Sequence, residues 1–535
     1  MVIDLFWFVL LPILFAVFSY LIYPKKGLIL VLFFQFLLFY LAVCNFLEVK
    51  ANGTRLEILG GYPQGIGISL KSDLVSAVLI MLVIFLFTNM ILFNYHKDYV
   101  NYLFRLLYLI LEGLICALFL SNDLFNIFVL VEVSTIIVSI LIIFKKYSQS
   151  IYDGIIYLFS NLIAASFFLF GIGILYRYFG VLDISLLTEA VSRFDNPPAL
   201  FLPFAMIITG LSLKSAVMPL FSWLPKAHGT PSAPSIVSAI LSGIYIKCGL
   251  FIFVRVSAIF HGVIDVGQIF IVMGALTAVV GFIFALSQTD IKLILAYHTV
   301  SQVGLMMLGL SLGTEYAYYG AFYHLINHAV FKSTLFLTAG IMIEEYHTRN
   351  LYEIKGLWQK QPLVALATLV SILGITGAPL FNGSYSKYLI EKGGLHLPFF
   401  DVLMLIINLG TIVSFVKYSS VLKKDNSQQR VPLRFNQSIV ILTLAAVTFL
   451  GGLFGPYLSS FFFGISKPIY ASDYLIKLGV YLLSIAVCYL FYRFFYHKIA
   501  LFKKIRQIEL SFNEIVLSMF IFFCGMYFYL IVFGG

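Results

Sequence analysis

The chain has 535 residues, of which 61% are hydrophobic and 11% are charged, and its mean hydropathy is +1.01. This composition excludes a soluble globular domain and indicates a polytopic membrane protein. The net charge of +10 does not point to nucleic-acid binding, because the basic residues lie in short loops between apolar runs. The cysteines form no CxxC pair, so neither a disulfide framework nor a zinc or iron–sulfur site is indicated; they are Cys44, Cys116, Cys248, Cys488 and Cys524.

Apolar stretches of about 20 residues, the length needed to cross about 30 Å of hydrocarbon, recur along the whole chain. The first, Leu5–Tyr23, is followed by Pro24-Lys25-Lys26 and has no small-residue cleavage site, so it is predicted to stay in the membrane instead of being a cleaved signal peptide. The sequence predicts an all-α membrane protein with about 16 spans: 5–23, 27–46, 73–95, 104–121, 122–144, 155–179, 199–222, 236–260, 264–287, 291–312, 318–342, 362–395, 398–422, 438–462, 474–497 and 512–533.

The distribution of basic residues predicts the orientation of these spans. Odd-numbered loops carry more than twice as many Lys and Arg residues as even-numbered loops. The positive-inside rule therefore predicts a multi-pass protein of the cell inner (cytoplasmic) membrane with both termini, including Gly535, outside. The most basic loops, 417–434 and 493–506, are then cytoplasmic, where they would orient the chain and contact anionic lipid.

Lys214 and Lys247 lie in apolar segments that a Pro- and Gly-rich stretch separates. A lysine near the bilayer centre costs about 2.5–3.5 kcal/mol, so each must face protein or water. Irregular backbone at membrane depth survives where it is buried in protein or lines a wet cavity, which predicts a conduit built on a discontinuous helix. A Pro-kinked helix with a snorkelling lysine is the plainer alternative. The prolines that exclude one continuous helix are Pro219, Pro225, Pro231 and Pro234.

Further ionisable residues lie inside the predicted spans: Glu112, Glu132, His324, His328, Lys332 and Lys387. The five core charges, which are those of Glu132 and the four lysines, would together cost on the order of 15 kcal/mol on lipid, more than a typical folding margin. They must pair or share an aqueous track, as a proton relay requires. Desolvation favours a neutral lysine and a nearby carboxylate favours a charged one, so small rearrangements can move a proton.

The spacing of His324, His328 and Lys332 is i, i+4, i+8, which places them on one helix face. A metal site is the alternative for the two histidines, although no HExxH motif or cysteine ligand accompanies them. At 1.5 Å per residue, Glu132 and Lys214 lie at depths that differ by a few ångströms, so we expect them to form a functional pair. Glu112 receives no role.

Four stretches of the chain, in this order, resemble one family of membrane subunits: Asn122-Asp-Leu-Phe-Asn-Ile-Phe-Val-Leu-Val-Glu132; Leu213-Lys-Ser-Ala with Trp223-Leu-Pro-Lys-Ala-His; Asp290-Ile-Lys-Leu-Ile-Leu-Ala-Tyr-His-Thr-Val-Ser-Gln-Val-Gly304; and His324-Leu-Ile-Asn-His-Ala-Val-Phe-Lys332. They resemble the antiporter-like subunits of respiratory complex I, membrane-bound hydrogenases and Mrp sodium/proton antiporters, above all the Mrp D subunit and the hydrogenase relatives. The resemblance covers roughly residues 58–395, beginning at Gly60-Gly-Tyr-Pro and Gly65-Ile-Gly-Ile-Ser-Leu.

This resemblance implies roles for particular residues. Glu132 matches the glutamate of span 5, Lys214 the lysine of span 7, and Lys247 the bridging base of span 8. The group of span 11 matches His324, His328 and Lys332, and the terminal group of span 12 matches Lys387. The resemblance also implies two inverted five-helix repeats. The expected parts are an N-terminal segment (1–103), a first repeat (104–260), a second repeat (261–422) and a C-terminal segment (423–535). The loop between spans 15 and 16 is too short for the long lateral helix of the longest complex I member.

The function implied is a proton-translocating subunit of a multi-subunit membrane complex, with exchange for Na⁺ left open. No nucleotide, flavin or quinone motif is present, so no cofactor is expected and the driving force must come from an ion gradient or from partner subunits; no nucleic-acid partner is expected. Whether the complex is an ion-translocating oxidoreductase or an antiporter stays open. One alternative is a membrane hydrolase or transferase that uses His228 or His324/His328, and another is a non-conducting scaffold.

Overall fold

The computed structural model describes residues 3–22, 27–229 and 233–533. Six residues used in the topology and helix-break predictions lie outside these ranges, namely Tyr23, Pro24, Lys25, Lys26, Pro231 and Gly535. Fourteen helices of the described chain are long and apolar enough to cross a membrane, and two shorter apolar helices stand where spans 1 and 12 were predicted. The all-α membrane fold is thus confirmed, whereas the count of sixteen and the outside location of both termini stay predictions.

The N-terminal segment contains α1 (Trp7–Ile22), α2 (Gly27–Asn52) and α3 (Leu74–Asn94), and the two strands β1 (Arg55–Ile58) and β2 (Ser69–Ser72) precede α3. The first predicted repeat contains α4 (Tyr102–Leu120), α5 (Leu124–Ile143), α6 (Ser148–Phe179), the surface helix α7 (Ile184–Ser192), α8 (Phe201–Lys214), α9 (Trp223–Gly229), α10 (Ser235–Ile240) and α11 (Ile246–Ile259).

The second predicted repeat contains α12 (Gly267–Ser287), α13 (Ile291–Ser311), α14 (Glu315–Tyr346), α15 (Leu357–Lys360), α16 (Pro362–Thr376), α17 (Asn382–Gly393) and α18 (Phe400–Tyr418). The C-terminal segment contains α19 (Phe435–Leu453), α20 (Gly455–Phe463), α21 (Ala471–Phe494), α22 (Ala500–Arg506) and α23 (Phe512–Phe533).

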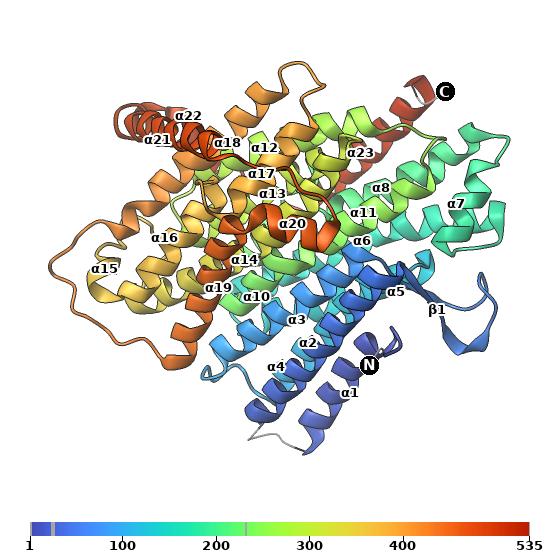
Figure 1. The fold of residues 1–535 in the computed structure, drawn as a ribbon, viewed down its shortest axis with the longest axis horizontal. Coiled ribbons are helices and arrows are strands. Elements are labelled where there is room, and N and C mark those ends of the chain that lie inside the picture. The colour runs from blue at the N-terminus through green and yellow to red at the C-terminus, as the bar shows by residue number, and fades with distance from the viewer. Residues whose placement is uncertain (1–2, 23–26, 230–232, 534–535) are drawn as a thin grey trace.

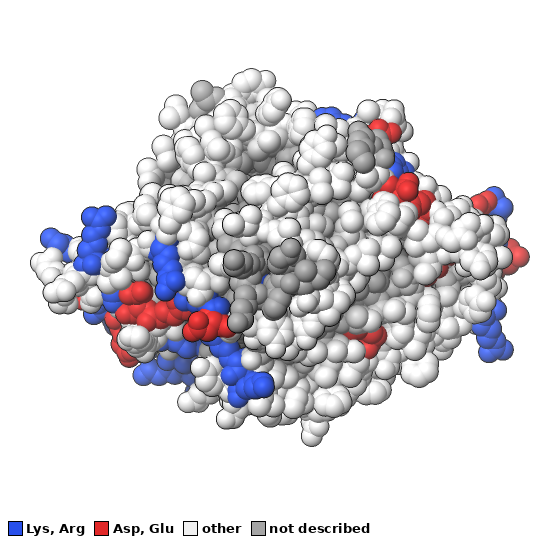
Figure 2. Space-filling view, turned by 90° about the horizontal axis from the view of Figure 1, so that it is seen from below, with Lys and Arg blue, Asp and Glu red and all other residues white. Residues whose placement is uncertain are grey.

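Several of these helices begin at a residue whose side chain accepts a hydrogen bond from the first turn. Asp73 caps α3, Asn101 caps α4, Asp123 caps α5 and Asp290 caps α13. Such caps satisfy backbone N–H groups that would otherwise lack a partner, and they fix the polar ends of apolar helices. On the face shown in Figure 2, charged side chains gather mainly towards the two ends and the broad middle is mostly white, as expected for a surface that faces lipid.

The C-terminal segment covers both predicted repeats. Helix α21 packs on α18, whereas α23 packs on α8 and α6, so the connection between α21 and α23 crosses from one side of the molecule to the other (Figure 1). At the opposite end of the chain, α1 packs on α4 and α2 packs on α3.

The structure corrects two predicted spans and adds one element. The predicted span 438–462 is two helices, α19 and α20, that meet at Phe454 because Gly455 and Pro456 interrupt the helix. The helix expected over 199–222 ends at Lys214. The antiparallel hairpin β1–β2, with Arg55 opposite Ser72 and Ile58 opposite Ser69, was not predicted, because strands of four residues give only a weak alternation.

Two helices are broken at membrane depth, as expected for a conduit. Between α8 and α9 the chain turns at Ala216 (φ 53°), and between α16 and α17 it turns at Gly377 (φ 77°) and Leu380 (φ 70°). Each broken helix is the fourth membrane-crossing element of its predicted repeat. The domain boundaries and the inverted relation of the repeats stay predictions.

Candidate functional site: a buried polar axis

Lys214 is the last residue of α8 and is only 4% exposed. Its Nζ donates to Thr135 Oγ1 at 2.9 Å and to the Tyr245 hydroxyl at 2.6 Å. Glu132 lies one turn before Thr135 on α5 and interacts with Lys214 electrostatically, without forming an ion pair with it within 4.0 Å. The lysine therefore points to two hydroxyl groups beside the carboxylate, and the functional pair with Glu132 stays a prediction.

Lys247 lies just after a π-helical turn, Leu241–Tyr245, that joins α10 to α11. π-Helical turns are frequent at functional sites, and this one ends at Tyr245, the partner of Lys214. Lys247 is fully buried; its Nζ contacts the Ser242 carbonyl and lies 2.8 Å from His328 Nδ1. The turn thus places Tyr245, the partner of Lys214, two residues before Lys247.

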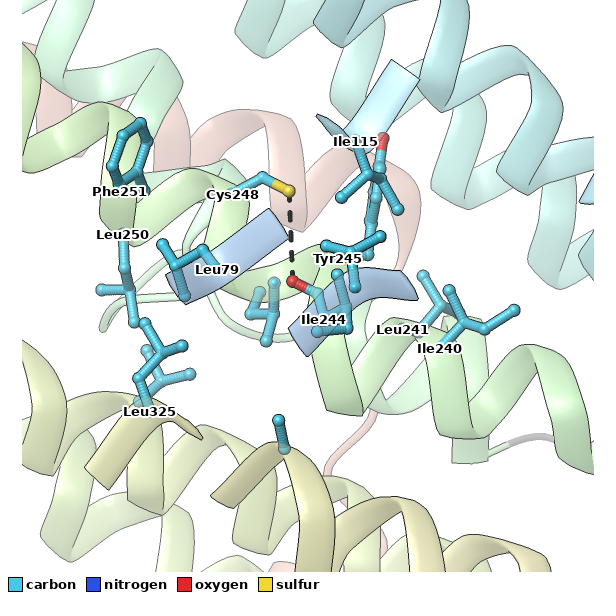
Figure 3. Close-up of a cluster of buried hydrophobic side chains, with 14 of the residues drawn as sticks. Leu79, Ile115, Ile240, Leu241, Ile244, Tyr245, Cys248, Leu250, Phe251 and Leu325 are labelled. Carbon is cyan, nitrogen blue, oxygen red and sulfur yellow. Dashed lines mark hydrogen bonds between the residues drawn. The ribbon is translucent and has the colours of Figure 1, made fainter. Parts of the chain in front are cut away.

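Apolar side chains pack around this turn on several sides. Leu79, Ile115 and Leu325, from α3, α4 and α14, surround it in Figure 3, and the thiol of Cys248 points to the Ile244 carbonyl at 4.0 Å. Because the packing excludes lipid, the nearby lysines contact only protein groups or enclosed water, as the cost of a lysine in lipid requires.

Three ionisable residues of α14 continue the polar contacts. His324 lies 3.0 Å from Gln302 Oε1 through Nε2 and 2.9 Å from Ser386 Oγ through Nδ1. Lys332 donates to the Leu295 carbonyl on α13. Together with His328 they are fully buried, and their shared helix face joins the turn around Lys247 to α13 and α17.

Lys387 lies beyond the second helix break, on α17. Its Nζ donates to the Ile375 carbonyl at 2.8 Å and to Asn408 Oδ1 at 2.9 Å. It also lines a cavity of about 340 Å³, together with Glu391, Asp401 and Lys477. Ser386, the partner of His324, directly precedes it, so both residues have partners or neighbours in the second turn of α17.

Two other residues singled out from the sequence are fully buried. The Oε2 of Glu112 accepts a hydrogen bond from Gln35 Nε2 on α2 at 2.5 Å. This contact includes no residue of the polar axis, which consists of Lys214, Lys247, His324, His328, Lys332 and Lys387. His228 is buried against Phe336, with ring centroids 5.2 Å apart. Within the described ranges no three His, Cys, Asp or Glu side chains are grouped as ligands for a metal ion.

Sequence reasoning missed three buried or partly buried lysines near helix ends. Lys292 donates to the Ala233 carbonyl at 2.7 Å, Lys417 donates to the Leu286 carbonyl at 2.6 Å, and Lys477 lies 3.5 Å from the centre of the Tyr388 ring. Each falls inside a predicted span but close to its end, where a lysine is expected to snorkel to water. The three charges were visible in the sequence, but their closeness to the span ends indicated contact with water and not a place in the relay.

Comparisons with known proteins agree with this architecture. The chain is 29% identical over 354 residues to the D subunit of the Na(+)/H(+) antiporter of Alkalihalophilus pseudofirmus, covering 65% of this chain and 71% of that protein. It is 26% identical over 420 residues to the protein of the same name from Bacillus subtilis, covering 76% of this chain and 85% of that protein.

Two solved structures share the fold. A chain of the membrane-bound sulfane sulfur reductase, an archaeal respiratory membrane complex, superposes with a TM-score of 0.79 and 25% identity over 90% of this chain and 99% of that one. A chain of the Mrp complex from Dietzia sp. gives a TM-score of 0.78 and 22% identity over 94% and 99%. Residues 121–413, more than half of the chain, match the family described as NADH:quinone oxidoreductase/Mrp antiporter, TM. The resemblance seen in the sequence is confirmed, and the chain belongs to this family of membrane subunits.

Proposed function

We propose that the chain is a proton-translocating subunit of a multi-subunit membrane complex. Protons would pass along half-buried Glu132 and the buried residues Lys214, Lys247, His324, His328, Lys332 and Lys387. The observation that carries the proposal is a set of polar contacts distributed between the two helix breaks: Lys214 with Tyr245, Lys247 with His328, and His324 with Ser386, the residue before Lys387.

The chemistry of these groups suits proton transfer. Lysine, imidazole and hydroxyl groups can each donate and, when a proton has left, accept. Four buried lysines in different helices would be costly as fixed charges, because burial of an unpaired charge destabilises a fold by several kcal/mol. A role in which each lysine exchanges its proton with a neighbour explains why the chain retains them. The names of the two antiporter relatives favour exchange of H⁺ for Na⁺ as the reaction of the complex.

The exposed face of α5 is evidence for a partner subunit. Glu132 is only half-buried, and its neighbours on this face are large exposed apolar side chains, including Val129, Val133 and Ile136. A carboxylate at membrane depth on such a face is costly against lipid. We propose that another membrane subunit covers this face, as the solved complexes of similar chains suggest.

The test uses Lys247→Ala and Lys332→Ala in the assembled complex, measured as proton transport in inverted membrane vesicles. Each variant should lower coupled transport at least tenfold while the chain stays at its normal level in the membrane. Lys504→Ala, on exposed α22, is the matched control and should transport normally. Normal transport by both buried-lysine variants would overturn the relay and favour a non-conducting scaffold.

A further inference from the structure

A cavity of about 470 Å³ lies between the break of the first conduit helix and the connection from α21 to α23. Its walls come from α6 (Gln149, Asp153), from the α8–α9 break (Pro219), from α9 (Lys226), from α13 and from residues 506–510. The cavity lies at the end of the molecule that the distribution of Lys and Arg predicts to be cytoplasmic. None of its charged side chains belongs to the polar axis described above.

The connection from α21 to α23 is fixed across this end of the molecule by specific contacts. The Tyr496 hydroxyl donates to the Leu286 carbonyl at 3.0 Å, and Arg506 Nε donates to the Ser287 carbonyl at 2.8 Å. Glu509 forms an ion pair with Lys226 of α9. The connection therefore joins the end of α12 to the broken helix and closes one side of the cavity.

Lys226 and Glu509 differ sharply in exposure. The lysine side chain is 8% exposed and the glutamate side chain is 67% exposed. The ion pair therefore joins the buried ammonium of Lys226 to a carboxylate that faces water. The remaining charges of the cavity have partners of their own: Asp290 pairs with Arg349 at 2.6 Å, and Arg506 is held by Ser287. Lys226 is thus the charge that the connection positions directly.

Asp153 lines the same cavity as Lys226 and is more deeply buried. It is 1% exposed, its Oδ2 accepts from Gln149 Nε2 at 3.0 Å, and it interacts electrostatically with both Lys226 and Glu509. A buried carboxylate needs a compensating charge or a proton. Because Glu509 also pairs with Lys226, the positive charge of Lys226 compensates the Asp153 carboxylate only in part. Asp153 is therefore able to take up a proton.

A route leads from Asp153 to the polar axis along one face of α6. Tyr157 follows Asp153 by one helical turn, about 6 Å along the helix axis, so the two side chains share one face of α6. The Tyr157 hydroxyl is buried close to Tyr245 and Thr135 without forming a hydrogen bond to either, and Tyr245 accepts the hydrogen bond from Lys214. Asp153, Tyr157 and Tyr245 therefore form the route from the cavity to Lys214 at the end of α8.

We propose that this cavity is the proton-intake site of the first repeat, with Asp153 as the proton acceptor and with Glu509 as the residue that positions Lys226. The proposal rests on the proton-translocating function proposed above. The Asp153 carboxylate binds a proton from water and becomes the acid. It then passes a proton to the Tyr157 oxygen while that hydroxyl gives its own proton to Tyr245, which in turn protonates neutral Lys214. Asp153 ends as the carboxylate and Lys214 as the ammonium.

The experiment compares Asp153→Asn, Asp153→Glu and Lys214→Ala in vesicles that contain the complete complex. Asp153→Asn should lower coupled proton transport at least tenfold, and Asp153→Glu should keep most of it, because a purely structural hydrogen-bonding role would be served by the amide. Glu189→Gln, on the exposed surface of α7, is the control for loss of a carboxylate and should be neutral. Native transport by Asp153→Asn with an inactive Lys214→Ala would overturn the intake site alone, whereas native transport by both would also overturn the proposed function.

Three further variants keep the test decisive. If Asp153→Asn does not assemble, Tyr157→Phe removes only the hydroxyl of the route and should still lower transport severalfold; native transport by this variant would overturn the route. Glu509→Gln should lower transport about three- to fivefold because Lys226 is then free to pair with Asp153, and Glu509→Asp should restore it. Equal transport by Glu509→Gln and the native chain would contradict the positioning role.

Discussion

The two helix breaks place a lysine in different surroundings. At the first break, Lys214 ends α8 and binds the side-chain hydroxyls of Thr135 and Tyr245. At the second, Lys387 follows the break and binds the carbonyl of Ile375, the penultimate residue of α16, together with Asn408. A lysine held by side chains can change partners by rotamer motion, whereas a backbone carbonyl at a helix end is a fixed acceptor that favours the cation.

The surroundings also differ in access to water. Lys387 lines a cavity of about 340 Å³ with two carboxylates and a second lysine, while Lys214 is enclosed by α5, α8 and the π-helical turn. The comparison suggests that the two breaks have different roles: the first controls when a proton moves, and the second releases it. The variants below test these roles, starting from the largest expected effect.

Lys214→Arg should abolish most coupled transport, a loss of more than tenfold, although it conserves the charge. Arginine keeps its proton in proteins, whereas a desolvated lysine can release it. The measurement is proton transport in inverted vesicles at matched protein levels, with Lys214→Ala and Glu132→Gln as parallel variants that should lose as much. Substantial transport by Lys214→Arg would show that this lysine is structural, and the first break would then lose its role as the controlling step.

Glycines permit close packing at both breaks, and the second is tighter. A Cβ added at Gly383 would lie 2.0 Å from the Gly374 carbonyl oxygen, whereas one at Gly249 would lie 2.7 Å from Ser215 Oγ and 3.0 Å from the carbonyl carbon of Lys214. Overpacking costs about 1–3 kcal/mol, so Gly383→Ala should lower thermal stability of the purified complex more than Gly249→Ala. Equal stability of the two variants would mean that the second break yields more easily than its contacts indicate.

The sequence predicted the first break and the axis lysines because both leave local signals. Pro219 interrupts an apolar run, and a charge inside such a run is visible without any structure. The hydrogen-bond partners of these lysines leave no such signal. Thr135 is 79 residues from Lys214, and a threonine in an apolar helix does not stand out in a sequence. Lys226 and Glu509 are 283 residues apart and each resembles an ordinary loop charge, so their ion pair required the fold.

Tyr245→Phe should lower coupled transport about three- to tenfold. The change removes one of the two acceptors of Lys214 and the hydroxyl nearest to Tyr157, and the enclosed site offers no ready replacement. A hydrogen bond to a charged group contributes about 1.5–3 kcal/mol, part of which Thr135 would recover. Tyr457→Phe, at a 69% exposed position of α20, is the control. Unchanged transport by Tyr245→Phe would indicate that Lys214 uses Thr135 or Glu132 alone.

Asn408→Leu should have the smallest effect, a decrease of about twofold in coupled transport. The substitution keeps side-chain volume and removes only the amide acceptor of Lys387, so packing is disturbed little. The Ile375 carbonyl remains, and water in the adjoining cavity can replace the amide at a cost of about 0–2 kcal/mol. If Asn408→Leu instead lowered transport as strongly as Tyr245→Phe, Lys387 would depend on a movable side-chain partner in the same way as Lys214, and the proposed contrast between a controlling break and a releasing break would fail.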